Sequence, residues 1–223
     1  MRLGLFGGTF DPPHSGHLIV AQDALHALRL DRVVFVPAAV PPHKRRREIT
    51  DAAVRLEMVR AAITGDPRFV ADDVELRREG PSYTVDTLRA YRAQRPDAAI
   101  FLLLGADQYA DFDTWREPQA IRDLATLAVL SRSGVDNVEG EAATARPGHE
   151  AGTSGPRVSG GQGVVRVAVT RIDLSSTDIR RRVSAGEPIR YLVPDAVERL
   201  IRERALYVPP GGSGVSNRTA AAG

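Results

Sequence analysis

The sequence contains no cysteine, a single lysine and no long run of apolar residues. Without cysteine, the chain cannot form disulfides, use a thiolate nucleophile or bind a metal through sulfur. No stretch reaches 18 consecutive apolar residues, so no membrane-spanning helix is expected. The first residues also lack the long apolar region and small-residue cleavage site of a signal peptide. We therefore expect a soluble, cytoplasmic protein without a membrane partner.

The charge of the chain is nearly balanced, with a formal net charge of +2 despite an isoelectric point near 9.3. Few groups titrate between pH 7 and 9, so a small cationic surplus moves the isoelectric point far. This balance does not indicate a nucleic-acid partner. Among the 30 lysine and arginine residues, Lys44 is the one lysine. It is either an accident of an arginine-rich composition or a position that needs a compact, flexible ammonium group.

Apolar, β-branched segments alternate with amphipathic ones along the chain. We expect strands at residues 3–6, 33–37, 69–74, 100–104, 126–130 and 164–169, and helices at residues 15–29, 51–64, 84–95, 177–185 and 194–204. This alternation predicts an α/β fold with a parallel sheet covered by helices on both faces. We expect one domain over residues 1–207, with a flexible insertion at 133–163 and a disordered tail at 208–223.

A run of glycine, proline and histidine follows the first predicted strand and reads Gly7-Gly-Thr-Phe-Asp-Pro-Pro-His-Ser-Gly-His17. Glycine lets the backbone approach a ligand closely, and proline is tolerated in a first helical turn. His14 and His17 are three residues apart and share a helix face, with Gly16 leaving room between them. Free amides, the helix dipole and two imidazole donors together favour a phosphate site. An ordinary turn with structural histidines and a His-x-x-His metal site are the alternatives.

A second candidate anion site lies near the other end, in Leu174-Ser-Ser-Thr-Asp-Ile-Arg180. Ser175 or Ser176 can cap the helix that follows, and this role alone would explain the hydroxyl residues. Hydroxyls, free amides and Arg180 one turn later can also bind an anion. Arg181 and Arg182 are expected to be solvated, because three successive residues cannot all face one ligand.

Both motifs resemble those of one superfamily. The run from Gly8 to His14 followed by Ser-Gly-His17 resembles the signature of the HxGH nucleotidyltransferases, and the second string is similar to their Ser-(Ser/Thr)-Thr-x-(Ile/Leu)-Arg motif. The resemblance implies a Rossmann-like, doubly wound sheet with a small C-terminal helical part, and transfer of a nucleotidyl group to a phosphate acceptor. It assigns ATP binding to Gly8, Thr9, Phe10, His14, His17, Ser176, Thr177 and Arg180.

Segments after other predicted strands resemble the nicotinate mononucleotide branch of this superfamily. Taken alone, the basic loop 41–47 is a solvated or nucleic-acid-binding loop, Thr84 is a helix cap and Trp115 is a core residue. The resemblance instead places Gly105 and Asp107 beside adenosine. It assigns acceptor binding to Lys44, Tyr83, Thr84, Trp115 and Arg132.

The resemblance implies that the 5′-phosphate of nicotinate mononucleotide attacks the α-phosphate of ATP and expels pyrophosphate. The expected catalytic residues are His14, His17, Lys44 and Arg180, with Mg²⁺ bound mainly by phosphates and water rather than by the protein. The acid form of the acceptor is favoured over the amide, and a homo-oligomer is left open. The alternatives are a phosphopantetheine adenylyltransferase or CDP-alcohol-forming enzyme, a non-catalytic nucleotide-binding regulator, and a metal hydrolase built on the two histidines.

Overall fold

The computed structural model describes residues 1–40, 49–131, 144–145 and 163–209. Within these ranges the strands form one sheet, in the order β3-β2-β1-β4-β5-β7-β6. They are β1 (Arg2–Gly8), β2 (Arg32–Pro37), β3 (Phe69–Ala71), β4 (Ala99–Gly105), β5 (Thr126–Ser131), β6 (Thr144–Ala145) and β7 (Val164–Ala168). Every neighbouring pair is parallel. No described helix is long and apolar enough to cross a membrane.

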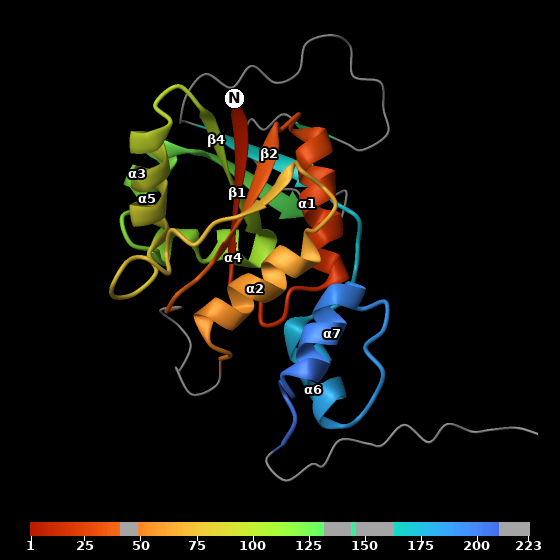
Figure 1. Cartoon of the computed structure of the whole chain (residues 1–223). Coiled ribbons are helices and arrows are strands. Elements are labelled where there is room, and N and C mark those ends of the chain that lie inside the picture. Colours follow the sequence, from red (N-terminus) through yellow and green to blue (C-terminus); the bar gives the residue numbers. More distant parts are fainter. Residues whose placement is uncertain (41–48, 132–143, 146–162, 210–223) are drawn as a thin grey trace, which may run out of the picture.

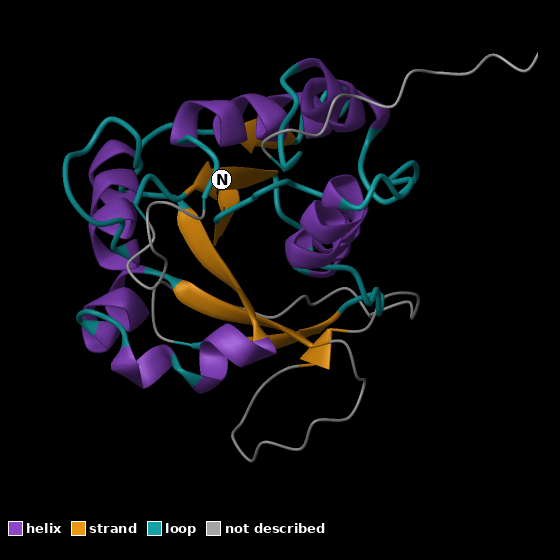
Figure 2. Ribbon diagram, turned by 90° about the horizontal axis from the view of Figure 1, so that it is seen from below, coloured by secondary structure: helices purple, strands orange, loops and turns teal. Residues whose placement is uncertain are grey.

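Helices cover both faces of the sheet, as the sequence predicts (Figures 1 and 2). On one face, α1 (Ser15–Ala27) and α2 (Ala52–Ala62) pack on a core that includes Phe6 and Phe101. On the other face, α3 (Thr84–Gln94) and α5 (Pro118–Leu124) pack on Leu5 and Leu102. Successive strand residues point to opposite faces, so a strand buried on both sides is apolar throughout. The predicted α/β fold is confirmed.

A small C-terminal helical part packs beside α2 rather than on the sheet. It consists of α6 (Ser176–Ser184) and α7 (Asp195–Glu203), which lie together below α2 in Figure 1. Ile179 and Val197 are fully buried and share a cluster with Met58 of α2. This cluster places the second sequence motif at the edge of the main domain.

The strand order defines where a ligand is expected. β2 and β3 lie to one side of β1, whereas β4, β5 and β7 lie to the other, so the order reverses between β1 and β4. Ligands of open α/β sheets bind beyond the carboxyl ends of the strands at such a reversal. The loop after β1 carries the first motif, and Gly105 ends β4.

Some elements are shorter in the structure than predicted, and some short elements of the structure were not predicted. The strand expected at 69–74 ends at Ala71, because the Asp72 carboxylate accepts the backbone N–H of Val74 at 2.9 Å and turns the chain. The helix expected at 15–29 ends at Ala27, since Arg29 has a φ of +48°. The sequence analysis did not predict α4 (Ala106–Ala110), the 3₁₀ helix η2 (Phe112–Thr114), α5 or β6. β6 lies inside the segment expected to be a flexible insertion; most of that segment and nearly all of the expected tail are outside the described residues.

Candidate active site

The two histidines of the first motif lie against each other at the start of α1. His14 is the N-cap residue and is 6% exposed. The rings of His14 and His17 stack with centroids 3.7 Å apart, and the backbone N–H of His14 donates to Nδ1 of His17 at 3.2 Å. A neutral imidazole that accepts at Nδ1 carries its proton on Nε2. The fold thus selects the tautomer in which Nε2 of His17 is a donor.

The surroundings of His17 keep its imidazole neutral. Burial lowers the pKa of His17 well below its ordinary value, and the electrostatic interaction with His14 lowers it further. The ring of Phe10 lies 5.1 Å from that of His17, and the ring of Phe6 lies 6.1 Å away. Aromatic neighbours cannot solvate a cation as water does, so the free protein disfavours the imidazolium form.

Gly16 provides the space that His14 occupies. A Cβ atom at position 16 would lie 3.1 Å from Nδ1 of His14 and 3.2 Å from its Cε1. These distances are shorter than ordinary van der Waals contacts, so any larger residue would push against the His14 ring. The glycine between the histidines therefore sets the position of the first one.

The second motif contacts the first, although they are more than 160 residues apart in the sequence. The hydroxyl of Ser176 donates to the carbonyl of Pro12 at 2.8 Å. The guanidinium of Arg180 donates to the carbonyl of Asp11 at 2.7 Å and to the hydroxyl of Thr177 at 3.3 Å. Ser175 is the N-cap of α6 and accepts the N–H of Asp178. Arg181 and Arg182 form ion pairs with Asp178 and Glu187 instead of facing the loop.

Asp11, for which the sequence predicted no role, connects the loop after β1 with Thr50 and Tyr207. Its carboxylate, 3% exposed, accepts the hydroxyl of Tyr207 at 2.6 Å and the backbone N–H of Thr50 at 3.1 Å. Burial and the bond to Asp11 raise the pKa of Tyr207 above its ordinary value. Tyr207 follows α7, so the end of the described chain is fastened to the loop after β1. No local pattern indicates this contact, because it joins distant segments.

A cavity of about 820 Å³ opens beside this loop. It brings together six of the predicted site residues, drawn from both the ATP and the acceptor sets: Gly8, Thr9, Tyr83, Thr84, Asp107 and Trp115. Loops after β1 and β4 and the start of α3 form its walls. Its volume is within the range of small-molecule sites.

Trp115 lies between the apolar core and the cavity. Its ring packs 5.6 Å from that of Phe112 on the apolar core, and it also lines the cavity. Next to it, the guanidinium of Arg116 lies 4.6 Å from the centre of the Tyr83 ring. Together these side chains give the cavity an aromatic wall with a cation on it.

Two other predicted residues have structural roles that their neighbours explain. A Cβ atom at Gly105 would lie 2.5 Å from Oδ1 of Asp107, so only glycine lets that carboxylate lie over the end of β4. The ring of Phe10 is 2% exposed and packs among Phe6 and Phe35. The ring of Phe10 is therefore part of the apolar core. Lys44 and Arg132 lie outside the described residues.

Comparison with known proteins agrees with this geometry. The model of the cytidylyltransferase-like family matches residues 5–182, a range that includes both motifs. The chain therefore belongs to this family of nucleotidyltransferases.

Two relatives indicate which branch of the family the chain belongs to. The chain is 42% identical over 206 residues to a protein of Shouchella clausii and 44% identical over 207 residues to one of Thermus thermophilus. These matches cover 92% and 93% of this chain and 96% and 100% of the relatives, both named as probable nicotinate-nucleotide adenylyltransferases. Within the family, the chain belongs with the nicotinate-nucleotide adenylyltransferases.

One solved structure shares the fold at low sequence identity. It is the nicotinic acid mononucleotide adenylyltransferase of Plasmodium falciparum in complex with NaAD, with a TM-score of 0.69 and 15% identity. The match covers 92% of this chain and 97% of that one. It supports the Rossmann-like architecture independently of the sequence motifs.

Proposed function

We propose that this chain transfers the adenylyl group of ATP to the 5′-phosphate of nicotinate mononucleotide, giving deamido-NAD and pyrophosphate in NAD biosynthesis. One observation carries the proposal. Ser176 and Arg180 of α6 are bonded to the loop that holds the stacked histidines, and this loop borders a cavity large enough for a nucleotide. The family membership and the names of the relatives support the same reaction.

In the proposed reaction, an oxygen of the acceptor's 5′-phosphate attacks the α-phosphorus of ATP. The bond to the bridging oxygen breaks, and pyrophosphate leaves with the electron pair. The acceptor is already an anion, so no general base is needed, and catalysis comes from positioning and from neutralising charge. His14 and His17 would hold the triphosphate and donate to the oxygens that gain charge. Ser176, Thr177 and Arg180 would hold the leaving pyrophosphate.

Three of the proposed roles rest on the sequence resemblance more than on the described contacts. Lys44 would draw the phosphates of the two reactants together, and Arg132 would contact the acceptor. Asp107 would accept a hydrogen bond from the sugar or base of adenosine. Mg²⁺ would enter bound to ATP, since it retains several waters and needs few protein carboxylates. When bound, it would neutralise part of the phosphate charge.

We propose the acid form of the acceptor as the substrate. α3 begins at Thr84, so its first-turn amides and helix dipole favour an anion at this wall of the cavity. Trp115 would stack on the pyridine ring. We further propose that residues 1–207 act as one cytoplasmic domain.

The test is pyrophosphate release with ATP, Mg²⁺ and a panel of acceptors: nicotinate mononucleotide, nicotinamide mononucleotide, 4′-phosphopantetheine and glycerol 3-phosphate. We expect strong release with nicotinate mononucleotide and much weaker release with the others. Release with another acceptor alone would keep the nucleotidyltransferase class and overturn the substrate. Absence of release with every acceptor, in a protein that binds ATP, would favour a non-catalytic nucleotide-binding role.

A further inference from the structure

A fully buried arginine lies next to the proposed site but outside the predicted motifs. Arg55 is in the first turns of α2, and its side chain is 1% exposed. It shares a helix face with Met58 and Val59, which are core residues. An arginine on an apolar helix face is the sequence signal that marks this position. Burying a guanidinium is unfavourable unless its donors are satisfied by hydrogen-bond acceptors.

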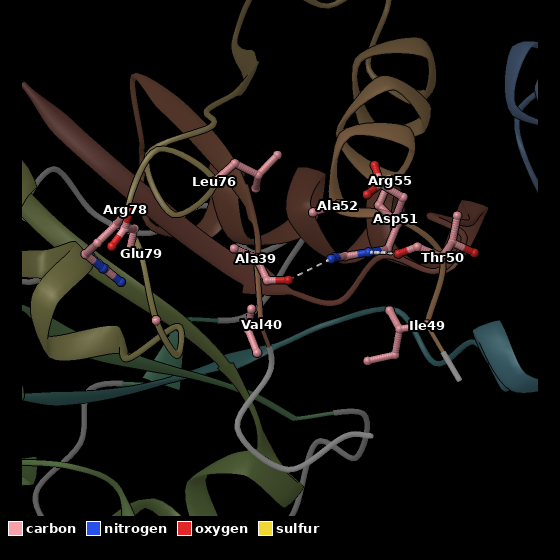
Figure 3. A pocket seen from close by; sticks show the side chains of 11 residues that line it. Ala39, Val40, Ile49, Thr50, Asp51, Ala52, Arg55, Leu76, Arg78 and Glu79 are labelled. Carbon is pink, nitrogen blue, oxygen red and sulfur yellow. Dashed lines mark hydrogen bonds between the residues drawn. The ribbon is translucent and has the colours of Figure 1, made fainter. Parts of the chain in front are cut away.

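Among the described residues, the guanidinium of Arg55 donates only to backbone carbonyl groups. Nη1 donates to Thr9 at 2.7 Å, and Nε donates to Thr50 at 2.8 Å. Nη2 donates to Ala38 at 2.6 Å and to Ala39 at 3.4 Å. Figure 3 shows the side chain reaching between Ala39 and Thr50. The planar fork of arginine can hold several acceptors at fixed angles, which a lysine cannot reproduce.

These carbonyls belong to different loops that meet at the cavity. Thr9 follows β1 and lies in the loop of the first motif, whereas Ala38 directly follows β2. Both Thr9 and Ala38 line the cavity of about 820 Å³. Arg55 does not line that cavity, but it lines a neighbouring one of about 730 Å³. Arg55 thus bonds to two segments that line the proposed site, the one at Thr9 and the one at Ala38, without lining that cavity itself.

The carboxylates near Arg55 help to keep its guanidinium charged, so that it can hold these carbonyl groups at all times. Burial lowers the pKa of Arg55, while the carboxylates of Asp11 and Asp51 raise it. An arginine side chain remains protonated in proteins, so its donors are always present. Asp11, in turn, accepts the N–H of Thr50, the residue whose carbonyl Arg55 holds.

We infer that Arg55 is a positioning residue for the proposed adenylyl transfer: it fixes the phosphate-binding loop after β1 against the chain after β2, and so sets the spacing of the two reactants without touching either. The inference rests on the proposed function. It predicts that loss of Arg55 lowers kcat in folded protein more than it raises either KM.

The experiment compares Arg55→Ala, Arg55→Lys and the control Arg60→Ala, which removes an exposed arginine of the same helix. Each is assayed with ATP and nicotinate mononucleotide at a temperature where circular dichroism shows it folded. For Arg55→Ala we expect kcat to fall by about 10²-fold, the loss that a misplacement of about 1 Å can produce. Arg55→Lys should lose less but remain impaired, and Arg60→Ala should match the wild type.

Chemical rescue separates positioning from folding. Because Arg55 lines a cavity, millimolar ethylguanidinium can reach the space left in Arg55→Ala and restore kcat saturably. Tetramethylammonium, a cation without N–H donors, should not. An unchanged kcat in folded Arg55→Ala, or in Arg55→Lys should the alanine variant not fold, overturns the inference. A wild-type protein that is inactive with every acceptor instead overturns the proposed function.

Discussion

At the scale of single residues, the proposed chemistry depends most on the imidazole of His17. Its Nδ1 is occupied by the backbone N–H of His14, which leaves the proton on Nε2. The pKa of His17 is lowered by burial and by His14. Nε2 can therefore donate to a phosphate oxygen while the imidazole stays neutral.

Replacing His17 by alanine should lower kcat by about 10²–10³-fold, the usual loss for one transition-state donor. The measurement is steady-state pyrophosphate release, with His26→Ala as a control on an exposed position of the same helix. Near-normal turnover in His17→Ala would show that the assigned role is wrong.

ATP binding should take up no proton through His17. Burial holds the pKa of His17 well below its ordinary value, and a second proton would have to enter at Nδ1, which accepts the backbone N–H of His14. Calorimetry at pH 6 in buffers of different ionisation enthalpy measures the proton uptake that accompanies ATP binding. We expect equal uptake in the wild type and in His17→Ala. A larger uptake in the wild type would contradict the prediction.

Replacing Gly16 by alanine should impair activity without unfolding the protein. Alanine favours a helix over glycine by about 1 kcal/mol, but its Cβ would lie 3.1 Å from Nδ1 of His14. We expect a lower kcat/KM at an unchanged or higher Tm. A parallel fall of both, or no change in kcat/KM, would argue against the spacing role of Gly16.

At the scale of elements, α6 and the segment after α7 are bonded to the loop after β1. α6 supplies Ser176 and Arg180 to the loop after β1, while Tyr207 beyond α7 holds the Asp11 carboxylate of that loop. The bonds between the two motifs accompany the packing of α6 and α7 on α2.

Replacing Tyr207 by phenylalanine should destabilise the fold by about 1–3 kcal/mol, because a buried carboxylate loses a donor. Urea denaturation measures the change, with Tyr191→Phe at a residue that is 80% exposed as the control. Equal stability of the two variants would mean that the bond to Asp11 contributes nothing net.

The long elements were predictable from the sequence because their apolar patterns are local. Strands such as β4 and helices such as α1 were expected within a few residues of their bounds. The short elements α4 and η2 were missed, since five and three residues carry too little periodicity. Both anion motifs were recognisable as strings of residue types. The resemblance assigns both motifs to ATP, but their contact with each other is seen in the structure and is not predicted by either local pattern.

At the scale of the whole molecule, the site lies where the strand order reverses between β1 and β4. This reversal leaves a cavity between the loops of the two halves, in which Thr9 and Trp115 line the same space. Contacts made at a distance in sequence, such as those of Arg55 and Asp11, could not be predicted, because they depend on how the loops meet. The roles of Lys44 and Arg132 remain predictions.

In the proposed reaction, the bond between the α-phosphorus and the bridging oxygen of ATP breaks while the acceptor's phosphate joins that phosphorus. The most direct measurement follows the label from ATP carrying radioactive phosphorus at either the α or the γ position, with nicotinate mononucleotide and Mg²⁺. We expect the α label to appear in deamido-NAD and the γ label in pyrophosphate, in equal amounts. Label from the γ position in orthophosphate or in the acceptor, with none of the α label in a dinucleotide, would contradict it.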